Sequence, residues 1–462
     1  MVKNIVNSKL PDVILSVCSV LAEAGGQAWL VGGCVRDLLL GIVPKDWDIE
    51  VFGLEEKKLE SVLKALGHCE HVGKQFGVRK LWLDKLEIDI ALPRKEIKTG
   101  QGHQGFDVQC DPHLAPEQAT LRRDFTINAM MYDPLKKTLL DFHHGQQDLQ
   151  HRKLKHVSSA FVEDPLRPLR AMQFAARFAL ALDKDTALLC EKLLVEAKTL
   201  PASRIWDEWL KWAKAEQPSF GLKALQDMGW DSLYPQLKAL QSCPQDAFWH
   251  PEGDVWIHTC LVVDEARKLC SLRSLSEKDS ITLVFAALCH DLGKPDVTFT
   301  NEEGKICSPN HGKAGVKSSL DFLHAISAPK GLVKKVKPLV CEHVAHFSGE
   351  PTTRAVKRLA KRLLPSNIKL WEILTEADSN GRHPAPPSRP ALVWLNLAEG
   401  LGITLCEEPA IITGKLLLEW GMKASPAMGE MLRLAYEAQV EGEFANKTSA
   451  YKWFCEVNHC KF

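Results

Sequence analysis

The sequence predicts an α+β protein whose strands lie near the N-terminus and whose remaining length is helical. A glycine pair, Gly32-Gly33, follows a short apolar strand, and the runs Phe76–Leu83 and Leu86–Leu92 are typical of two strands around a turn. From Gln150 onward, apolar residues recur at helical spacing and no strand pattern competes. A length of 462 residues leaves room for roughly three domains.

Composition excludes several classes of protein. Hydrophobic residues make up 45% of the chain and charged residues 25%, so wholesale disorder is excluded. No apolar run reaches the ~20 residues of a membrane-spanning helix, and the N-terminal residues lack a signal-peptide pattern. The 14 cysteines form no CxxC pair and are typical of reduced thiols. We therefore expect a cytoplasmic protein without a membrane partner. Because the net charge is zero, any nucleic-acid partner must bind through local patches.

The N-terminal elements are expected in a definite order. They are a helix over residues 1–28, a strand at Leu30–Val31, a short helix carrying Arg36 and Asp37, a turn at Gly41–Pro44, a strand beginning at Asp46, a helix over 55–67, the strand pair, and a mobile loop over 98–118. The stretch Asp141–Leu149 is expected to close this region as a polar turn.

The stretch Leu30–Gly53 carries the first candidate site. Gly32 and Gly33 let backbone N–H groups approach an anion, and the helix that follows favours negative charge at its start. Asp46 and Asp48 are two apart on a predicted strand and so share a face. A phosphate loop beside two carboxylates predicts Mg²⁺ held against a triphosphate. Separately, a glycine pair is usually a turn and an Asp-x-Asp a solvated strand end, so the combination carries the argument.

Two further groups could complete this site. Asp89 lies on the second strand of the pair and could be a third acidic group, or an ordinary edge-strand charge. Leu121–Met130 is expected to begin a helix or to join a strand to one, with Arg122, Arg123 and Asp124 adjacent and Asn128 one turn later. Paired arginines can bind a triphosphate and an aspartate can accept a ribose hydroxyl, although such a run is also common in surface ion-pair clusters.

The segment Glu163–Arg167 opens the helical region. Pro165 suits a first helical turn, so Asp164 could simply cap the helix. Alternatively, Asp164 accepts and Arg167 donates hydrogen bonds side by side. That pair matches cytosine and adenine, which both place an amino donor beside a ring-nitrogen acceptor. Uracil and guanine present the reverse order and would leave buried groups unpaired, at a cost of about 1–3 kcal/mol each.

A second candidate centre follows in segments that are expected to be helical. His258, the pair His290-Asp291 and the distant Asp378 are suitable ligands for one or two divalent metals that activate water against a phosphate ester. His311 and His343 could add to them. A His-Asp pair is also common at helix ends, but the apolar lead-in and the following Gly293-Lys294 make this one more specific.

The last part of the chain is helical by composition. A proline-rich linker follows Gly381, and the final ~75 residues have the helical pattern. A solvated helix face is the ordinary interpretation of the basic run over Arg354–Arg362, but with a nucleic-acid substrate it becomes a phosphate contact. The basic residues of this run are Arg354, Lys357, Arg358, Lys361 and Arg362.

Together these motifs resemble the tRNA nucleotidyltransferases, the CCA-adding enzymes of the bacterial and eukaryotic class, with an HD domain attached. The resemblance extends from about Ala28 to Arg382. It rests on GGCVRDLLLG with DWD, RRDFTINAM, DFHHGQQDL, EDPLR with Arg170, and SRIWDEW, in the family's order. Two positions depart from the family pattern: Gln173 stands where a further arginine is usual, and Ser203 where relatives often have glutamate.

The resemblance implies a fold and a set of domains. The fold is a nucleotidyltransferase head with a small mixed sheet, followed by an all-helical neck, body and tail. The expected boundaries are 1–145 for the head, 146–240 for the neck, 241–385 for the HD-type body and 386–462 for the tail.

The resemblance also implies a reaction. C, C and A are added to the 3′ end of tRNA from CTP and ATP without a nucleic-acid template, with two Mg²⁺ ions in the head. The HD site holds a divalent metal, with Ni²⁺, Mn²⁺ and Mg²⁺ as candidates, and has phosphohydrolase activity. The resemblance assigns triphosphate contacts to Gly32, Gly33, Arg36 and Arg123, ribose contact to Asp124, metal to Asp46 and Asp48, base reading to Asp164 and Arg167, and a further nucleotide contact to Arg170.

Alternatives stay open at the level of sequence. A poly(A) polymerase, or an enzyme that adds only CC or only A, shares the head and neck motifs, and the HD segment argues against the first. Less favoured are a protein whose HD half does the main work and a non-catalytic tRNA-binding protein. The sequence leaves monomer and homodimer equally open, along with the identity of the HD-site metal and how one pocket changes from C to A.

Overall fold

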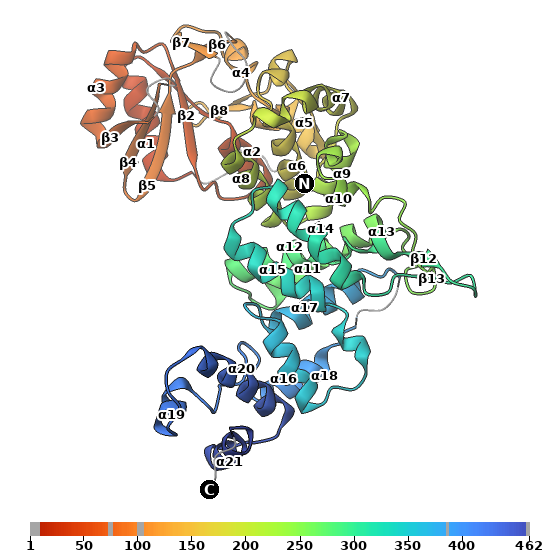
Figure 1. Cartoon of the computed structure of the whole chain (residues 1–462). Helices are drawn as coiled ribbons and strands as arrows, with labels where there is room; N and C mark the ends of the chain where they lie inside the picture. Colours follow the sequence, from red (N-terminus) through yellow and green to blue (C-terminus); the bar gives the residue numbers. More distant parts are fainter. Residues whose placement is uncertain (1–9, 73–76, 99–105, 385–387, 459–462) are drawn as a thin grey trace. The chain divides into compact units, whose positions relative to one another are not determined.

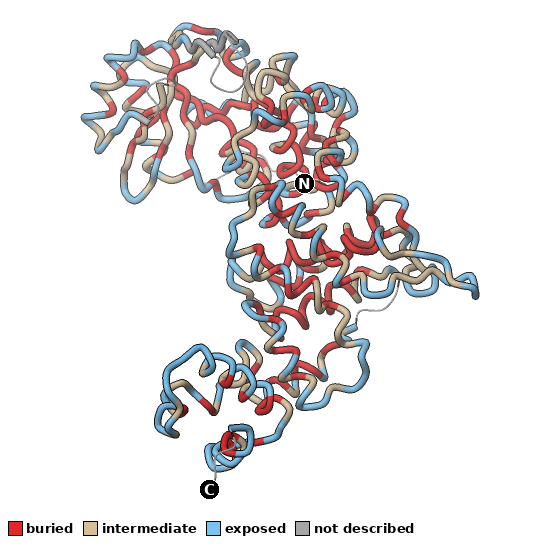
Figure 2. Tube along the Cα trace, viewed as in Figure 1, coloured by how far each residue is buried: buried red, intermediate tan, exposed pale blue. Residues whose placement is uncertain are grey.

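A computed structural model describes residues 10–72, 77–98, 106–384 and 388–458. The chain forms two compact units, Met1–Leu233 and Tyr234–Phe462 (Figure 1). Buried residues follow the central strands and the packed helices within each unit, and exposed residues gather on the loops and on the helices near the C-terminus (Figure 2). Among the described residues, no helix is both long and apolar enough to cross a membrane.

The first unit is built on a mixed seven-stranded sheet of order β3-β4-β5-β2-β1-β8-β9. β2 pairs with β5 in parallel, and the other neighbours are antiparallel. The strands are β1 (Gln27–Val31), β2 (Trp47–Phe52), β3 (His68–Val72), β4 (Val78–Leu83), β5 (Leu86–Ala91), β8 (Met131–Asp133) and β9 (Thr138–Leu140). The small mixed sheet expected for the head is confirmed.

Helices complete the first unit. The amphipathic α1 buries Ile14, Val17 and Leu21, and α3 ends at Gly67 as expected. The helices are α1 (Asp12–Glu23), α2 (Gly33–Leu40), α3 (Glu56–Leu66), α4 (Pro116–Thr120), α5 (Gly145–Gln150), α6 (Arg167–Phe178), α7 (Lys184–Lys192), α8 (Ala202–Ala213) and α9 (Pro218–Asp227). A two-stranded ladder joins β10 (Lys153–Leu154) to β11 (Ala181–Leu182).

Several local expectations for this unit were wrong. Residues 98–118 are not a loop throughout, because β6 (Arg94–Lys98) and β7 (Phe106–Cys110) form a hairpin and α4 follows; residues 99–105 lie outside the described part. The helix expected at 1–28 stops at Glu23, where Gly25 at φ +93° leads into β1. Residues 1–9 are not described.

Two of the polar motifs also differ from expectation. No α-helix begins within Leu121–Met130; α4 has already ended at Thr120, and a one-turn 3-10 helix over Thr126–Asn128 follows. The predicted polar turn at Asp141–Leu149 contains α5. Asp141 accepts hydrogen bonds from the backbone N–H groups of Gly145 and Gln146 at 2.7 and 2.9 Å, which satisfies donors at the helix start.

The second unit is helical, as expected. Its helices are α10 (Pro235–Lys238), α11 (Val255–Leu272), α12 (Glu277–Cys289), α13 (Lys294–Val297), α14 (His311–Ala325), α15 (Lys330–Glu342), α16 (Thr353–Arg362), α17 (Ile368–Asn380), α18 (Leu392–Gly400), α19 (Gly414–Glu419), α20 (Pro426–Glu441) and α21 (Lys447–Val457). A short hairpin joins β12 (Phe299–Thr300) to β13 (Ile306–Cys307). The last three helices share a core cluster around Leu417, Ala435 and Phe454.

Candidate active site and metal centre

The end of β1 brings together a glycine, a carboxylate and a guanidinium. Gly32 has φ +73°, a conformation that favours glycine, and caps the start of α2. A Cβ atom on Gly32 would lie 3.0 Å from Arg123 Nη1 and 3.4 Å from Asp48 Oδ2. Gly32 and Asp48, which the sequence predicts in one site, therefore meet Arg123 of a second motif at one point. An anion at the helix start would face both a cation and the carboxylate that is predicted to hold metal.

Acidic groups crowd around Asp48 on β2. The parallel register places Asp48 opposite Asp89 of β5. Burial raises the pKa of Asp48 to about 6, and the charges of Asp89, Asp46 and Glu50 add to this rise while Arg123 opposes it. Asp46 is exposed and lies one residue before the strand begins. Carboxylates that repel each other at partial burial are suited to a cation. Asp89 therefore adds its charge to this acidic group, although its Oδ1 also lies 3.5 Å from Lys80 Nζ.

Glu50 is a buried member of this cluster that the sequence analysis missed. Arg122 Nη2 donates to its Oε1 at 2.8 Å, and Arg123 Nη2 lies 3.9 Å from its Oε2, which has no hydrogen-bond partner in the part of the chain that the structure describes. The signal was present in the sequence, because Asp46, Asp48 and Glu50 follow one another at the spacing of a strand face. A carboxylate oxygen without a donor fits a site that takes Mg²⁺.

Asp124 joins the head to α6 through a buried network. Arg170 donates to Asp124 Oδ2 from Nε at 2.9 Å and from Nη2 at 2.6 Å, and Asn128 donates to Oδ1 at 3.0 Å. Arg36 Nη1 in turn donates to Asn128 Oδ1 at 2.6 Å. Burial opposes ionisation, but the charge of Arg170 and the bond from Asn128 hold the pKa of Asp124 below its ordinary value. Arg36, Asp124 and Arg170 are thus brought together.

The predicted base-reading pair lies at the entrance to α6. Asp164 Oδ1 accepts a hydrogen bond from Leu166 N at 2.9 Å, so the capping interpretation describes part of its role. Arg167 is buried, and its Nη1 and Nη2 donate to the carbonyl oxygens of Ala160 and Arg122 at 2.8 and 2.7 Å. Within the described residues, the two side chains share no hydrogen bond. One Asp164 oxygen and the remaining Arg167 donors are therefore not committed to a hydrogen bond with each other.

In the second unit, Asp291 lies between two groups of histidines. Its Oδ2 is 3.1 Å from His290 Nε2 and 3.8 Å from His258 Nε2. Its Oδ1 is 3.4 Å from His311 Nε2 and 3.8 Å from His343 Nε2. Among the described residues, neither oxygen has a hydrogen-bond partner of good geometry, and both are buried. A carboxylate that presents one oxygen to each group of imidazoles fits one or two divalent metals.

The remaining predicted ligand also belongs to this cluster. Asp378 Oδ1 lies 3.1 Å from His258 Nε2, so all four ligands and both additional histidines converge. Burial opposes ionisation, yet His290 and Lys294 hold the pKa of Asp291 well below its ordinary value. Burial lowers the pKa of His343 to about 3, which keeps its imidazole neutral and able to bind metal.

Glu252 and Lys294 were not predicted as site residues. Glu252 Oε1 lies 2.8 Å from His258 Nδ1 and 2.9 Å from His250 Nδ1. Burial opposes ionisation, but hydrogen bonds from both imidazoles lower the pKa of Glu252 to about 2. A carboxylate on Nδ1 leaves Nε2 of His258 directed at the cluster. Lys294 Nζ lies 2.7 Å from Asp291 Oδ2, and its position three residues after Asp291 in the sequence was the available signal.

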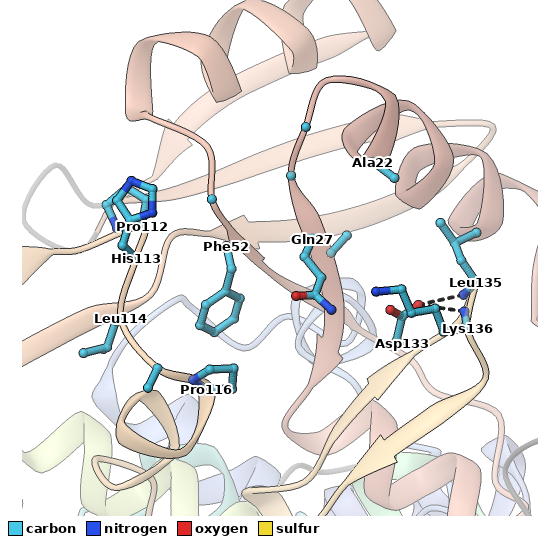
Figure 3. Close-up of a pocket in the computed structure, with 15 residues that line it drawn as sticks. Ala22, Gln27, Phe52, Pro112, His113, Leu114, Pro116, Asp133, Leu135 and Lys136 are labelled. Carbon is cyan, nitrogen blue, oxygen red and sulfur yellow. Dashed lines mark hydrogen bonds between the residues drawn. The ribbon is translucent and has the colours of Figure 1, made fainter.

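Two pockets differ in their relation to these sites. A pocket of about 380 Å³ adjoins the histidine cluster, with Asp291, Asp378, Lys294, His311 and Trp249 in its wall. A pocket of about 520 Å³ lies between Gln27 and Phe52, at the opposite end of β1 and β2 from Gly32 (Figure 3). Among the described residues, none of the predicted site residues lines that second pocket.

The basic run on α16 faces acidic partners in its own unit. Arg354 and Arg358 both pair with Glu441 of α20, Lys357 pairs with Glu408 at 2.7 Å, and Arg362 pairs with Glu342 at 3.0 Å. These pairs offset part of the positive charge that was considered for phosphate contact. Arg354 and Arg358 face α20, while the arginine side chains of the run remain about half exposed.

Comparison with known proteins follows the same division of the chain. Residues 28–155 match the Poly A polymerase head domain family, and residues 255–379 match the HD domain family. Multifunctional CCA proteins of Pasteurella multocida and Aliivibrio salmonicida are 36% and 37% identical over 368 residues. Each alignment covers 77% of this chain, and they cover 84% and 86% of the two relatives.

Solved structures share the fold. The Thermotoga maritima CCA-adding enzyme complexed with tRNA aligns with a TM-score of 0.60 at 18% identity, covering 98% of this chain and 97% of that one. The Bacillus stearothermophilus enzyme in complex with CTP aligns with a TM-score of 0.61 at 22% identity, covering 96% and 97%. At such low identity the likeness concerns the fold alone. The family is assigned from the curated relatives, whose alignments cover most of both chains, and from the two matched domain families. The chain therefore belongs to the multifunctional CCA proteins, the tRNA nucleotidyltransferases of the bacterial and eukaryotic class that carry an HD domain.

Proposed function

We propose that this nucleotidyltransferase adds C, C and A to the 3′ end of tRNA, using CTP and ATP and no nucleic-acid template. The meeting of Gly32, Asp48 and Arg123 at the start of α2 is the observation that carries the proposal. It supplies a backbone cradle for phosphate, a carboxylate for metal and a cation for the triphosphate in one place. The relatives named for CCA addition and the enzymes solved with CTP and tRNA support the choice of substrates.

Each residue of the head has a role in this proposal. Asp46 and Asp48 hold Mg²⁺, with Asp89 or Glu50 completing the acidic group. When bound, Mg²⁺ lowers the pKa of the attacking 3′-hydroxyl and offsets charge on the leaving pyrophosphate. Gly32 and Gly33 present backbone N–H groups to the triphosphate.

Arginines and Asp124 complete the nucleotide contacts. Arg123 supplies positive charge to the triphosphate. Arg36 and Arg170 hold Asn128 and Asp124 in place, so Asp124 accepts the ribose hydroxyl from a fixed position.

Asp164 and Arg167 select the base in this proposal. Arg167 is held by two carbonyl oxygens, so its remaining N–H groups have a fixed direction. An acceptor and a donor in fixed positions pair with the edges of cytosine and adenine and leave uracil and guanine unsatisfied. A protein surface can thereby replace the nucleic-acid template.

One assay tests the proposed reaction. Purified full-length protein is given a tRNA that lacks its 3′ CCA, with labelled CTP and ATP separately and together. We expect growth by two nucleotides with CTP alone and by three with both, followed by a stop. Long A tails would instead identify a poly(A) polymerase. Growth that stops after CC, or that requires a CC end, would identify a partial enzyme.

The histidine cluster favours a second activity. We propose that His258, His290, Asp291 and Asp378 hold a divalent metal, with Ni²⁺, Mn²⁺ and Mg²⁺ as candidates, and hydrolyse phosphate esters. Six potential ligands converge on buried carboxylate oxygens beside a pocket that also contains Lys294. Hydrolysis of a 2′,3′-cyclic nucleotide on addition of each metal in turn tests the activity. The Asp46→Ala variant should retain it, and loss of hydrolysis there would show that the assignment is wrong.

The finer division of the chain also remains a proposal. Head, neck, HD-type body and tail are proposed with boundaries at 145, 240 and 385. A cytoplasmic location is proposed as well, and the oligomeric state is a choice between monomer and homodimer. Sedimentation of the full chain distinguishes the two.

A further inference from the structure

Two aromatic rings of α6, Phe174 and Phe178, are surrounded by three arginines, Arg36 of α2 and Arg170 and Arg177 of α6, which the proposed reaction uses only in part. The rings of Phe174 and Phe178 stack with centroids 6.1 Å apart. The guanidinium carbons of Arg36 and Arg177 lie 4.3 and 5.1 Å from the centroid of Phe178, and that of Arg170 lies 5.3 Å from the centroid of Phe174. Three like charges around one pair of rings require counter-charge.

Two of the three arginines have counter-charges. Arg36 Nη2 lies 2.7 Å from Asp37 Oδ1, and Arg170 Nη2 lies 2.6 Å from Asp124 Oδ2. Both guanidiniums also belong to the network that joins the head to α6. These two arginines are therefore committed to partners within the protein.

Arg177 differs, because no carboxylate of the described chain pairs with it. Its only described hydrogen bond runs from Nη1 to Gln173 Oε1 at 3.5 Å, which is long. Asp37 and, less strongly, Glu208 act on it electrostatically, but Asp37 pairs with Arg36 at 2.7 Å and Glu208 with Lys211 at 2.8 Å. Loss of solvent and then the charge of Arg36 lower the pKa of Arg177. An incoming anion would relieve this repulsion.

A pocket of about 350 Å³ opens beside Arg177. Its wall contains two guanidiniums, one carboxylate, the exposed Glu216, and two amides, Gln150 and Gln217, and the remaining lining is apolar. Arg152 is exposed at a left-handed position with φ +52°, and Ile42 is 48% exposed. The residues used here are Arg152, Arg177, Leu40, Ile42, Phe178 and Leu180. Cationic and apolar groups in one pocket match the phosphate and the nucleoside of a nucleotide unit.

We propose that this pocket binds a backbone phosphate of the RNA substrate, with Arg177 and Arg152 as donors and Ile42 and Phe178 against the adjoining nucleoside. The assignment rests on the proposed function, which makes tRNA the substrate. Leu40 and Ile42 lie at the C-terminal end of α2, and Gly33 lies at its start. Eight helical residues span about 12 Å, so the pocket is a separate subsite from the triphosphate cradle.

Binding of tRNA in a salt series tests the proposal. Fluorescence anisotropy of a labelled tRNA lacking CCA is measured with the full chain and with Arg177→Gln, Arg152→Gln and the double variant. Each single change should weaken binding about fivefold and reduce the slope of log K against log salt by about 0.7–0.9. The KM for CTP should change less than about twofold, as expected for a subsite away from the triphosphate. Lys64→Gln, which removes an exposed charge on α3, should bind as the wild type does.

The alternative is that Arg177 only stabilises the end of α6, where a cation interacts favourably with the helix dipole. In that case the melting temperature falls in Arg177→Gln while tRNA binding and its salt slope stay unchanged, and the proposal is overturned. Arg177→Lys should restore the slope if the charge contacts phosphate. A raised KM for CTP with unchanged tRNA affinity would assign the pocket to the nucleotide triphosphate, which also overturns the proposal.

The two proposals fail in different ways. A wild-type protein that binds tRNA but adds no nucleotides contradicts the proposed reaction, while the salt slopes of the variants still report on the pocket. A wild-type protein that adds CCA, with variants that bind tRNA as it does, contradicts only the pocket assignment.

Discussion

Replacing Asp48 by asparagine should stabilise the metal-free protein while removing nucleotide addition. In the native state Asp48 has a pKa of about 6, compared with an ordinary value of 3.8. The native state therefore holds a proton that the unfolded state releases, and stability falls as pH rises from about 3.8 to about 6. At about 1.4 kcal/mol per pH unit, the buried charge costs about 3 kcal/mol at pH 8 and about half of that at pH 5. Asp48→Asn removes this cost.

Urea unfolding in EDTA, followed by tryptophan fluorescence, measures the effect. We expect the variant to be more stable than the wild type by about 1–3 kcal/mol at pH 8, with a smaller advantage at pH 5. Mg²⁺ should stabilise the wild type and leave the variant unchanged. Glu87→Gln removes a charge from an exposed strand position and serves as the control. A variant that is less stable at pH 8, or an advantage that does not depend on pH, would refute the reasoning.

Four further changes probe the remaining contacts. Asp124→Asn leaves the guanidinium of Arg170 without its counter-charge and should lower the free energy of unfolding by about 3 kcal/mol; calorimetry that shows no change would contradict the network. His290→Ala should abolish Mn²⁺ binding in titration calorimetry and leave CCA addition intact, and loss of both would show that the sites are coupled. Arg167→Ala should reduce discrimination against UTP about 10–100-fold in single-turnover assays, and unchanged discrimination would argue against base reading. Glu252→Gln should weaken Mn²⁺ binding about tenfold without unfolding the protein, and unchanged affinity would exclude an orienting role for Glu252.

Much of the fold could be predicted because a helix or strand with one buried face repeats apolar residues at a fixed spacing in the sequence. The strand pair β4 and β5, the helix α3 and the helical second unit were predicted because burial repeats along each of them. The hairpin of β6 and β7 was missed because β6, with the sequence RKEIK, has a single apolar residue. The apolar alternation of β7, FDVQC, lies within a stretch rich in Gly, His, Gln and Pro that is typical of a loop. The sequence likewise contained no local reason for α5, whose start depends on the side chain of Asp141.

Site residues could be predicted from the sequence where binding of a metal or a phosphate favours a particular residue type. Gly32, Asp48, His290 and Asp291 were predicted because metals and phosphates favour such groups, and the structure brings Gly32 close to Asp48 and His290 close to Asp291. Residues that act on other residues were missed. Glu252 is recognised only by its contact with His258, which depends on how the start of α11 is placed. A sequence gives the spacing of such residues along the chain, whereas their role depends on distances between elements.

The same reasoning explains why the base-reading pair and the triphosphate contacts should act together. Arg167 donates to the carbonyl oxygen of Arg122, and the side chain of Arg122 donates to Glu50. The turn that carries Arg122 therefore also carries Arg123, which meets Asp48 and Gly32. In the proposed reaction, a base that pairs poorly with Arg167 should displace the guanidinium and so disturb the turn that is proposed to position the triphosphate. Selection against the wrong base should for this reason appear in the rate of the chemical step as well as in nucleotide affinity.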